Sequence, residues 1–129
     1  MSAIQGFVFG LNENDEAKEQ AKREYGEAKP WTKAMAKLAD QPNTICKISG
    51  IVAHATPDWT ADELAPVVNQ CLDRFGSERV MFGGDWPVCL LSARFDQWVN
   101  ALKEIVSNRP VEHQRKLFHD NAVRFYQLA

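Results

Sequence analysis

One carboxylate in this sequence stands where an α/β protein could use it for chemistry. Asp85 follows the apolar run Val80–Phe82 and a pair of glycines, and it precedes Trp86 and Pro87. A short apolar run bounded by glycine predicts a buried strand. Pro87 cannot donate to a ladder, so the strand should end at about Asp85. Because ligands bind at the carboxyl ends of parallel strands, Asp85 is either a functional carboxylate or a cap for the next loop.

A cation and an imidazole come from a second predicted strand. Lys47 lies inside the strand Thr44–Gly50, and His54 follows it in the loop Ile51–Trp59. The lysine is either a snorkelling side chain at a sheet edge or a cation that points into a polar barrel interior. The histidine is either solvated or in contact with a ligand, on the same side as Asp85 if the two strands are parallel.

The residues between these groups predict a strand–helix–strand unit. Thr60 stands three residues before Glu63, as in a capping box, and Gly76 suits the position after the helix. The helix between them has one apolar stripe at helical spacing, made of Leu64, Val67, Val68, Cys71, Leu72 and Phe75. This order of elements implies that strands 44–50 and 80–85 are parallel.

Other helices are expected on both sides of this unit. Proline suits the first turn of a helix, so one helix should begin at Pro30 and end at Asp40–Asn43. Its apolar stripe consists of Trp31, Ala34, Met35 and Leu38. Ser92 is a plausible N-cap for a further helix. The core-facing residues of that helix would be Phe95, Trp98, Val99, Leu102, Ile105 and Val106.

The last part of the chain also has helical character. The segment Val111–His119 predicts one helix, and Asp120 or Asn121 should cap a final one. The inward residues of the final helix would be Ala122, Phe125 and Tyr126.

Composition bounds the class of protein. The 129 residues suffice for one domain. The 15 Lys+Arg and 17 Asp+Glu give a net charge of −2, which does not suggest binding to nucleic acid. No apolar run approaches the roughly 20 residues of a membrane span. The three cysteines form no CxxC pair, which indicates free thiols in a reducing compartment, so a cytoplasmic location is expected.

Residues 1–28 are the least defined part of the sequence. Ile4–Leu11 could be a short strand, whereas Asn12–Lys29 is dense in charge and lacks a clear apolar stripe. This second segment is expected to be an exposed helix or a linker. We therefore expect one organised domain over residues 29–129.

Three stretches carry a resemblance to a known family. They are LADQPNTICKISGI, FGSERVMFGGDWPV and NAVRFYQL, and together they resemble the C-terminal part of the amidohydrolase-related family, nearest its sugar-lactone and dicarboxylate-lactone hydrolases. The resemblance implies an α/β fold that is the C-terminal portion of a TIM (β/α)8 barrel, with parallel strands and flanking helices. Thr44–Gly50 would be the seventh barrel strand and Val80–Asp85 the eighth.

The chain departs from the family in length and in its histidines. Members are roughly twice as long and carry a His-x-His pair on their first strand, which this sequence lacks. The simplest interpretation is a partial barrel from a truncated or split gene, or a fragment. Its expected partners are a small-molecule substrate such as a lactone or a carboxylated ring compound, and an N-terminal half-barrel or a second copy of the chain.

The resemblance implies a hydrolase in which water attacks a lactone or a related ester or amide carbonyl. Asp85 matches the eighth-strand aspartate, which acts as general base and, in metal-dependent relatives, also approaches a divalent metal such as zinc or manganese. Lys47, His54 and Trp86 are the residues expected to contact substrate, although Trp86 could instead lie beneath the loop. The alternatives are a metal-dependent decarboxylase of the same superfamily, or a non-catalytic fragment.

Overall fold

Three short parallel strands form the sheet of the described part of the chain. The computed structural model describes residues 2–5 and 30–128. Strands β1 (Ser2–Gln5), β2 (Thr44–Ile48) and β3 (Val80–Phe82) lie in the order β1-β2-β3. Both pairs are parallel, so the predicted parallel pairing is confirmed. β2 is the central strand of this α/β unit.

The ends of all three strands differ from the expected ones. β2 ends at Ile48, two residues before the expected end at Gly50. β3 ends at Phe82, three residues before Asp85, although the next amide still donates to the Ile48 carbonyl at 2.8 Å. β1 begins earlier than the strand expected at Ile4–Leu11 and overlaps it by two residues. The rest of that predicted strand, and the charged segment after it, lie within residues 6–29, outside the described residues.

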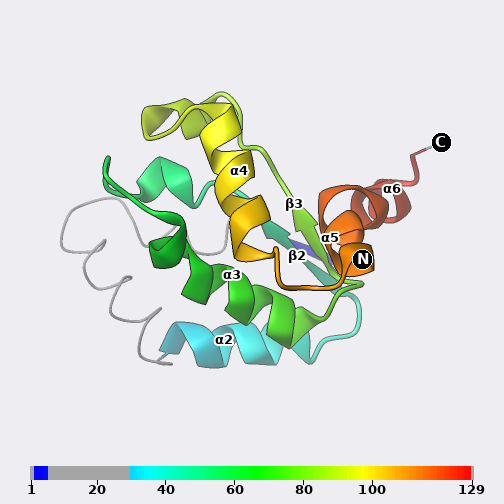
Figure 1. Cartoon of the computed structure of the whole chain (residues 1–129). Helices are drawn as coiled ribbons and strands as arrows, with labels where there is room; N and C mark the ends of the chain where they lie inside the picture. The colour runs from blue at the N-terminus through cyan, green and yellow to red at the C-terminus, as the bar shows by residue number, and fades with distance from the viewer. Residues whose placement is uncertain (1, 6–29, 129) are drawn as a thin grey trace.

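Helices α2 (Pro30–Ala39), α3 (Ala61–Phe75) and α4 (Phe95–Ile105) pack side by side along the strands (Figure 1). Local signals set the ends of α3 as predicted. The Thr60 side chain accepts a hydrogen bond from the Glu63 amide, and Gly76 ends the helix with a φ of 79°. Glycine suits that position because it adopts positive φ at little cost.

The start of α4 differs from the prediction. Ser92 is not its N-cap, because Ser92 ends the 3-10 turn η3 (Val88–Leu91) and Arg94 is the residue that precedes the helix. The Ser92 hydroxyl instead donates to the Ala55 carbonyl at 3.3 Å. Phe95 was expected to face the core, yet 42% of it is exposed, since it lies at the first position of the helix beside the loop that follows β3.

The C-terminal helical region is continuous through α5 (Val111–Arg115), the π-helical turn η4 (Lys116–Asp120) and α6 (Asn121–Tyr126). The expected cap at Asp120 or Asn121 is therefore wrong, because both residues have helical backbone angles or lie within the helix. Tyr126 was expected to face inward but is 47% exposed. Figure 1 places α5 and α6 near the beginning of the strands.

The core lies between the sheet and the helices. Val80 and Cys46, which pair in register, and Ile48 point into it from the strands. The largest of its fully buried helical side chains is Trp98, which packs with Leu102 of the same helix. The opposite face of the strands is also buried at Ile45 and Met81, as expected for strands of an α/β fold, which are covered on both faces.

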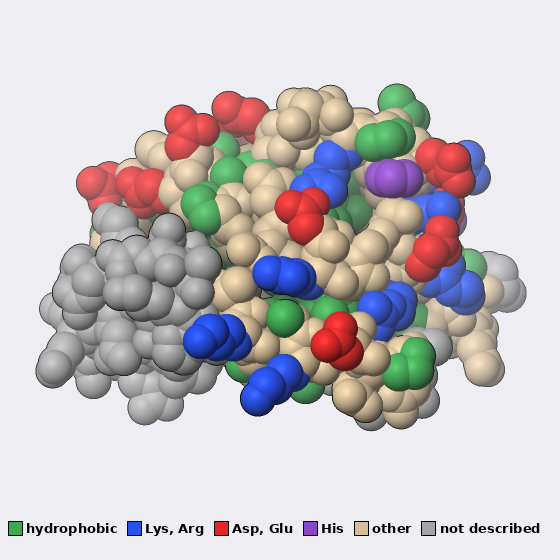
Figure 2. Space-filling model, turned by 90° about the horizontal axis from the view of Figure 1, so that it is seen from below, with side chains coloured by type: hydrophobic (Ala, Val, Ile, Leu, Met, Phe, Trp, Pro, Cys, Tyr) green, Lys and Arg blue, Asp and Glu red, His purple; other side chains and the backbone are tan. Residues whose placement is uncertain are grey.

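The surface over the helices carries mixed charge. Figure 2 shows Lys and Arg side chains interspersed with Asp and Glu on the face that is seen from below. Within the described part of the chain, no helix combines the length and apolar character that crossing a membrane requires.

Candidate active site

Asp85 lies in the loop just beyond β3, at the carboxyl end of the sheet, as the sequence predicts. Its backbone has a φ of 53°, in the left-handed region that few residues other than glycine adopt. The Asp85 carbonyl accepts a hydrogen bond from the Cys89 amide at 2.8 Å, which ties it to η3. The residue is half-buried. A backbone conformation of this kind persists only where the surroundings hold it.

The two glycines before Asp85 are needed because side chains occupy the space where their Cβ atoms would lie. A Cβ on Gly83 would be 2.8 Å from Lys47 Cε and 2.9 Å from Ser49 Cβ. A Cβ on Gly84 would be 2.5 Å from Cε2 of Phe95. The strand that carries Asp85 is therefore pressed between β2 on one side and α4 on the other.

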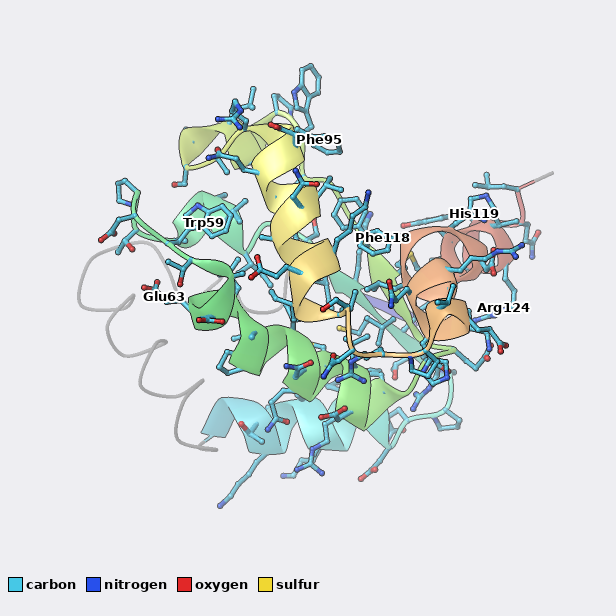
Figure 3. The ribbon with its side chains drawn as sticks, viewed as in Figure 1. Trp59, Glu63, Phe95, Phe118, His119 and Arg124 are labelled. Carbon is cyan, nitrogen blue, oxygen red and sulfur yellow. The ribbon has the colours of Figure 1, made fainter. Side chains whose placement is uncertain are left out.

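Helix α4 also holds this strand by a hydrogen bond. The indole N–H of Trp98, which is fully buried, donates to the Gly83 carbonyl at 3.3 Å. The Phe82 ring lies between aromatic neighbours, with centroids 5.9 Å from Trp98, 6.5 Å from Phe95 and 5.5 Å from Phe118. Figure 3 shows Phe95 near the start of α4 and Phe118 between α4 and the C-terminal helices.

Lys47 lies on the same sheet face as Ser49, next to the strand of Asp85. Because β2 is the central strand, the interpretation of Lys47 as an edge residue is wrong. Its Nζ donates to the Tyr126 hydroxyl at 3.3 Å and lies 5.7 Å from the centre of that ring. Sequence reasoning missed Tyr126 as a neighbour of Lys47, since they are 79 positions apart and no local pattern links them.

The loops that follow β2 and β3 lie side by side. The Trp59 indole N–H donates to the Ser92 carbonyl at 2.9 Å, and the Ser92 hydroxyl returns a bond to the first loop. His54 ends the 3-10 turn η2 (Val52–His54) in the loop after β2, but its side chain lies outside the described residues. Trp86 is 68% exposed, so the alternative that it packs beneath the loop is wrong.

Cysteine thiols and possible metal ligands are the remaining groups to consider at this site. Cys46, Cys71 and Cys89 are free and buried. Burial raises the pKa of the Cys89 thiol, and the nearby Asp85 charge raises it further, so this thiol stays protonated. In the described part of the chain, no group of three or more His, Cys, Asp or Glu side chains is placed to hold a metal ion.

Similarity to other proteins supports the assignment of the family. A curated protein of Sinorhizobium fredii, the uncharacterized protein y4mH, is 40% identical over 98 residues, which are 76% of this chain and 33% of that protein. L-Fucono-1,5-lactonase of Burkholderia multivorans is 38% identical over 107 residues, covering 76% of this chain and 35% of the lactonase. The chain thus spans about a third of the length of these curated relatives.

The structure also matches a solved one. The crystal structure of an amidohydrolase from Burkholderia multivorans with bound zinc superposes with a TM-score of 0.76 at 28% identity, over 98% of this chain and 44% of that chain. The amidohydrolase family model matches residues 17–128, which is most of the sequence. The chain therefore belongs to the amidohydrolase family.

Proposed function

We propose that residues 29–129 supply the last strands of a (β/α)8 barrel that hydrolyses a lactone, with β2 and β3 as its seventh and eighth strands. The observation that carries the proposal is the position of Asp85. Its carboxylate follows a parallel strand at the carboxyl end of the sheet, where barrel enzymes do their chemistry. The similarity to L-fucono-1,5-lactonase suggests a sugar lactone as the substrate.

In the proposed reaction, Asp85 acts as general base. Its carboxylate takes a proton from a water molecule while the water oxygen attacks the lactone carbonyl carbon. The ring C–O bond then breaks, and the proton passes to the leaving oxygen to give a hydroxy acid. The Lys47 ammonium would stabilise the oxyanion that develops on the carbonyl oxygen. His54 and Trp86 follow the carboxyl ends of the two strands and would contact the substrate.

The proposed step does not include a metal ion. Zinc is bound in the solved relative. In this chain, the described residues do not form a metal site by themselves, because Asp85 has no companion ligands among them. We therefore assign no step to a metal. A zinc or manganese ion near Asp85 would need ligands from other strands.

The chain by itself is expected to turn over no lactone. Catalysis of this type needs donors aimed at the carbonyl oxygen and a cavity that excludes water. Among the described residues, Lys47 is a cation that packs against the strand before Asp85, and Asp85 itself is half-exposed. An N-terminal half-barrel, or a second copy of the chain, would have to supply the remaining walls and donors.

A chimera tests the proposal directly. The segment of the Burkholderia multivorans L-fucono-1,5-lactonase that matches this chain would be replaced by residues 30–128, and hydrolysis of L-fucono-1,5-lactone would be followed with and without zinc. We expect turnover in the chimera and none in the isolated chain. Asp85→Asn keeps the shape of the side chain but removes the base, so it should lower kcat by about 10²–10⁴-fold.

The matched control is Asp58→Asn, which changes an exposed aspartate in the loop after β2. This variant should retain the rate of the parent chimera. Hydrolysis by Asp85→Asn at the parent rate would show that Asp85 has only a structural role. Turnover by the isolated chain that disappears in its own Asp85→Asn variant would show that the three described strands suffice for catalysis.

A further inference from the structure

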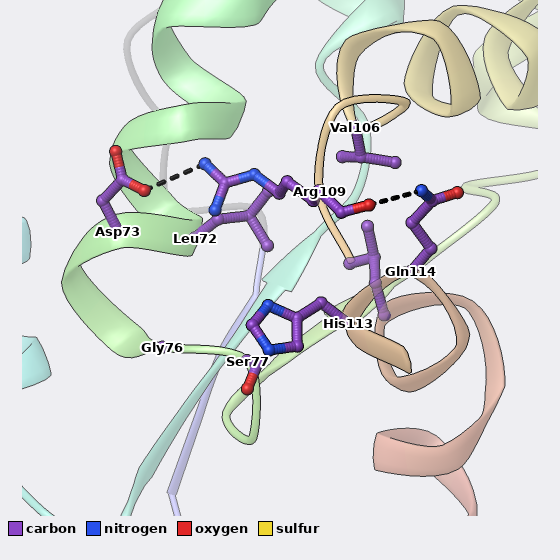
Figure 4. A pocket seen from close by; sticks show the side chains of 9 residues that line it. Leu72, Asp73, Gly76, Ser77, Val106, Arg109, His113 and Gln114 are labelled. Carbon is purple, nitrogen blue, oxygen red and sulfur yellow. Dashed lines mark hydrogen bonds and ion pairs between the residues drawn. The ribbon is translucent and has the colours of Figure 1, made fainter. Parts of the chain in front are cut away.

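A hollow lies at the other end of the strands from Asp85. It has a volume of about 220 Å³ and opens between the end of α3, the segment after α4, and α5 (Figure 4). Gly76 and Ser77, which precede β3, form part of its wall. Because Asp85 follows the opposite end of β3, this cavity is separate from the candidate active site.

The base of the cavity is apolar and well packed. Leu72, Val106 and Leu117 line it, and all three belong to the buried core. They come from α3, the end of α4 and η4, so three elements fix its shape. The volume is below the roughly 300–1,000 Å³ that is typical for drug-sized ligands, so the occupant must be small.

A positioned guanidinium lies at the rim. Nη2 of Arg109 donates to Asn69 Oδ1 and to Asp73 Oδ1, both at 2.9 Å. The Arg109 carbonyl accepts a bond from Gln114 Nε2 at 2.8 Å. The side chain is only 23% exposed. These contacts hold the Arg109 side chain against α3, and the two bonds to α3 use only one of its three nitrogens.

The polar side chains around the cavity include donors and acceptors, and the free groups of Arg109 are donors alone. A guanidinium has five N–H groups, so Nε and Nη1 of Arg109 retain donors. The His113 ring and the Ser77 hydroxyl have no hydrogen-bond partner within residues 30–128, and both line the same cavity. Arg109 and Asp73 form an ion pair, but the Asp73 side chain is 68% exposed and the Arg109 side chain only 23%. Water therefore screens the aspartate charge more than the guanidinium charge, and the free N–H groups of Arg109 favour an anion.

We propose that this cavity binds a small monocarboxylate with a compact apolar body. The apolar body would pack on Leu72, Val106 and Leu117, and the carboxylate would accept hydrogen bonds from Arg109 and His113. Charge-assisted bonds of this kind are the strong ones in carboxylate recognition. The proposal is independent of lactone hydrolysis, since no residue of the candidate active site takes part in it.

Benzoate, with benzamide as its neutral analogue, is a suitable probe for the 129-residue chain. Each compound would be titrated into protein with labelled Leu and Val methyl groups, and the shifts would be followed by NMR. We expect saturable shifts at Leu72, Val106 and Leu117, with little change at the exposed Leu91 near Asp85. Benzamide should bind at least tenfold more weakly, because it lacks the charge that Arg109 recognises.

Variants separate recognition from folding. Arg109→Gln should abolish saturable binding of benzoate, and His113→Gln should weaken it severalfold. The control is Arg94→Gln, which removes an exposed arginine paired with Asp96 and should change nothing. If Arg109→Gln unfolds the chain, His113→Gln and the benzamide comparison still decide. Equal affinity for the two probes, or shifts at Leu91 as large as those in the cavity, would overturn the proposal.

Discussion

The two ends of the strands are held together in different ways. At the beginning of β3, charged and amide side chains bond directly to backbone carbonyls. The end of β3 is built differently. It is followed by two glycines, by Asp85 with a left-handed backbone conformation, and by exposed apolar residues. The first end fixes the fold, whereas the second presents a carboxylate in a conformation that its neighbours impose. This is the division between stability and chemistry that barrel enzymes show.

The beginning of β3 is bound to four other elements, α2, β2, η4 and α6. Arg79, just before the strand, donates to the carbonyls of Ala39, Gln41 and Thr44, and so fixes the turn between α2 and β2. Glu78 pairs with Lys116 and Arg124 from the C-terminal helical region. Each contact joins segments far apart in the sequence, so this end acts as the assembly point of the fold.

The end of β3 exposes apolar surface instead. The large apolar residues that are exposed there are Trp86, Val88, Leu90, Leu91 and Phe95. Five large exposed apolar residues within ten positions are unusual, because exposed apolar patches usually mark a binding site. In the proposed barrel they would lie at the rim of the active site.

The largest effect on stability is expected from Asn121→Ala, which tests the hydrogen bonds at the beginning of β3. Asn121 is fully buried, and its Nδ2 donates to the carbonyls of Ser77 and Val80, both at 2.8 Å. Asn121→Ala removes both donors, and an unsatisfied buried carbonyl costs about 1–3 kcal/mol. We therefore expect a loss of about 2–4 kcal/mol in the free energy of unfolding, measured by urea denaturation.

Asn100→Ala is the control for this variant, because Asn100 is exposed on α4. It should leave stability unchanged or raise it slightly, since alanine has the higher helix propensity. A loss in Asn121→Ala no greater than that in Asn100→Ala would show that the carbonyls find other partners, and the first end would then not be the anchor described above.

A smaller effect on stability is expected from substitution of the two glycines that follow β3. In Gly83→Ala the new Cβ would meet Ser49 Cβ at 2.9 Å, and an atom so near the backbone cannot move far. In Gly84→Ala it would meet only the Phe95 ring, which is partly exposed and can rotate away. Overpacking costs about 1–3 kcal/mol, so Gly83→Ala should lie in that range and Gly84→Ala below it.

Thermal unfolding of the two variants measures the difference. Adding Phe95→Leu to Gly84→Ala should restore most of what that glycine substitution loses, whereas Gly83→Ala should not be rescued by it. A greater loss in Gly84→Ala than in Gly83→Ala would mean that α4, and not β2, sets the position of the strand before Asp85.

The smallest effect concerns pH and the ion pairs of Glu78. The hydrogen bond from Lys116, aided by its charge and that of Arg124, lowers the pKa of Glu78 in the folded chain. A lowered folded pKa means that the stabilisation is present above the ordinary glutamate pKa of about 4.3 and is lost as the pH falls through the folded value. Glu78 is exposed, so the gain is slight.

Glu78→Gln should therefore lower the melting temperature slightly at pH 7, and the difference from the parent should vanish in acid. The control is Glu104→Gln, which changes an exposed residue of α4 that has no ion pair within the described residues. A difference that persisted unchanged in acid would show that Glu78 acts through its shape and not through its charge.

Much of the fold could be predicted from the sequence because local signals set it. Pro30, Thr60 and Gly76 mark helix ends through their own backbone preferences, and the helix at 61–75 was predicted residue for residue. The parallel pairing followed from the order of elements, and the position of Asp85 followed from the glycines and Pro87. These predictions depend on residues within one turn or strand of each other.

The errors about polar side chains have a common physical cause. Ser92 and Asn121 were predicted as helix caps because such residues usually bond to nearby amides. In the structure they bond to carbonyls 37 and 41 positions away. The contact of Lys47 with Tyr126 is of the same kind. Polar side chains with long-range partners look the same in a sequence as those with local ones, and only the folded chain distinguishes them.

The crowding at Gly83 has a consequence for how this sequence can evolve. Lys47, Ser49 and Gly83 share one volume, because a Cβ on the glycine would overlap the other two side chains. Lys47 Cε lies near the end of a flexible side chain and can move aside, whereas Ser49 Cβ cannot. A larger residue at position 83 therefore becomes acceptable only after position 49 has lost its Cβ, so the order of substitutions matters. Such contacts make mutational effects non-additive. A lineage that keeps a side chain at position 49 therefore also retains the glycine two residues before Asp85.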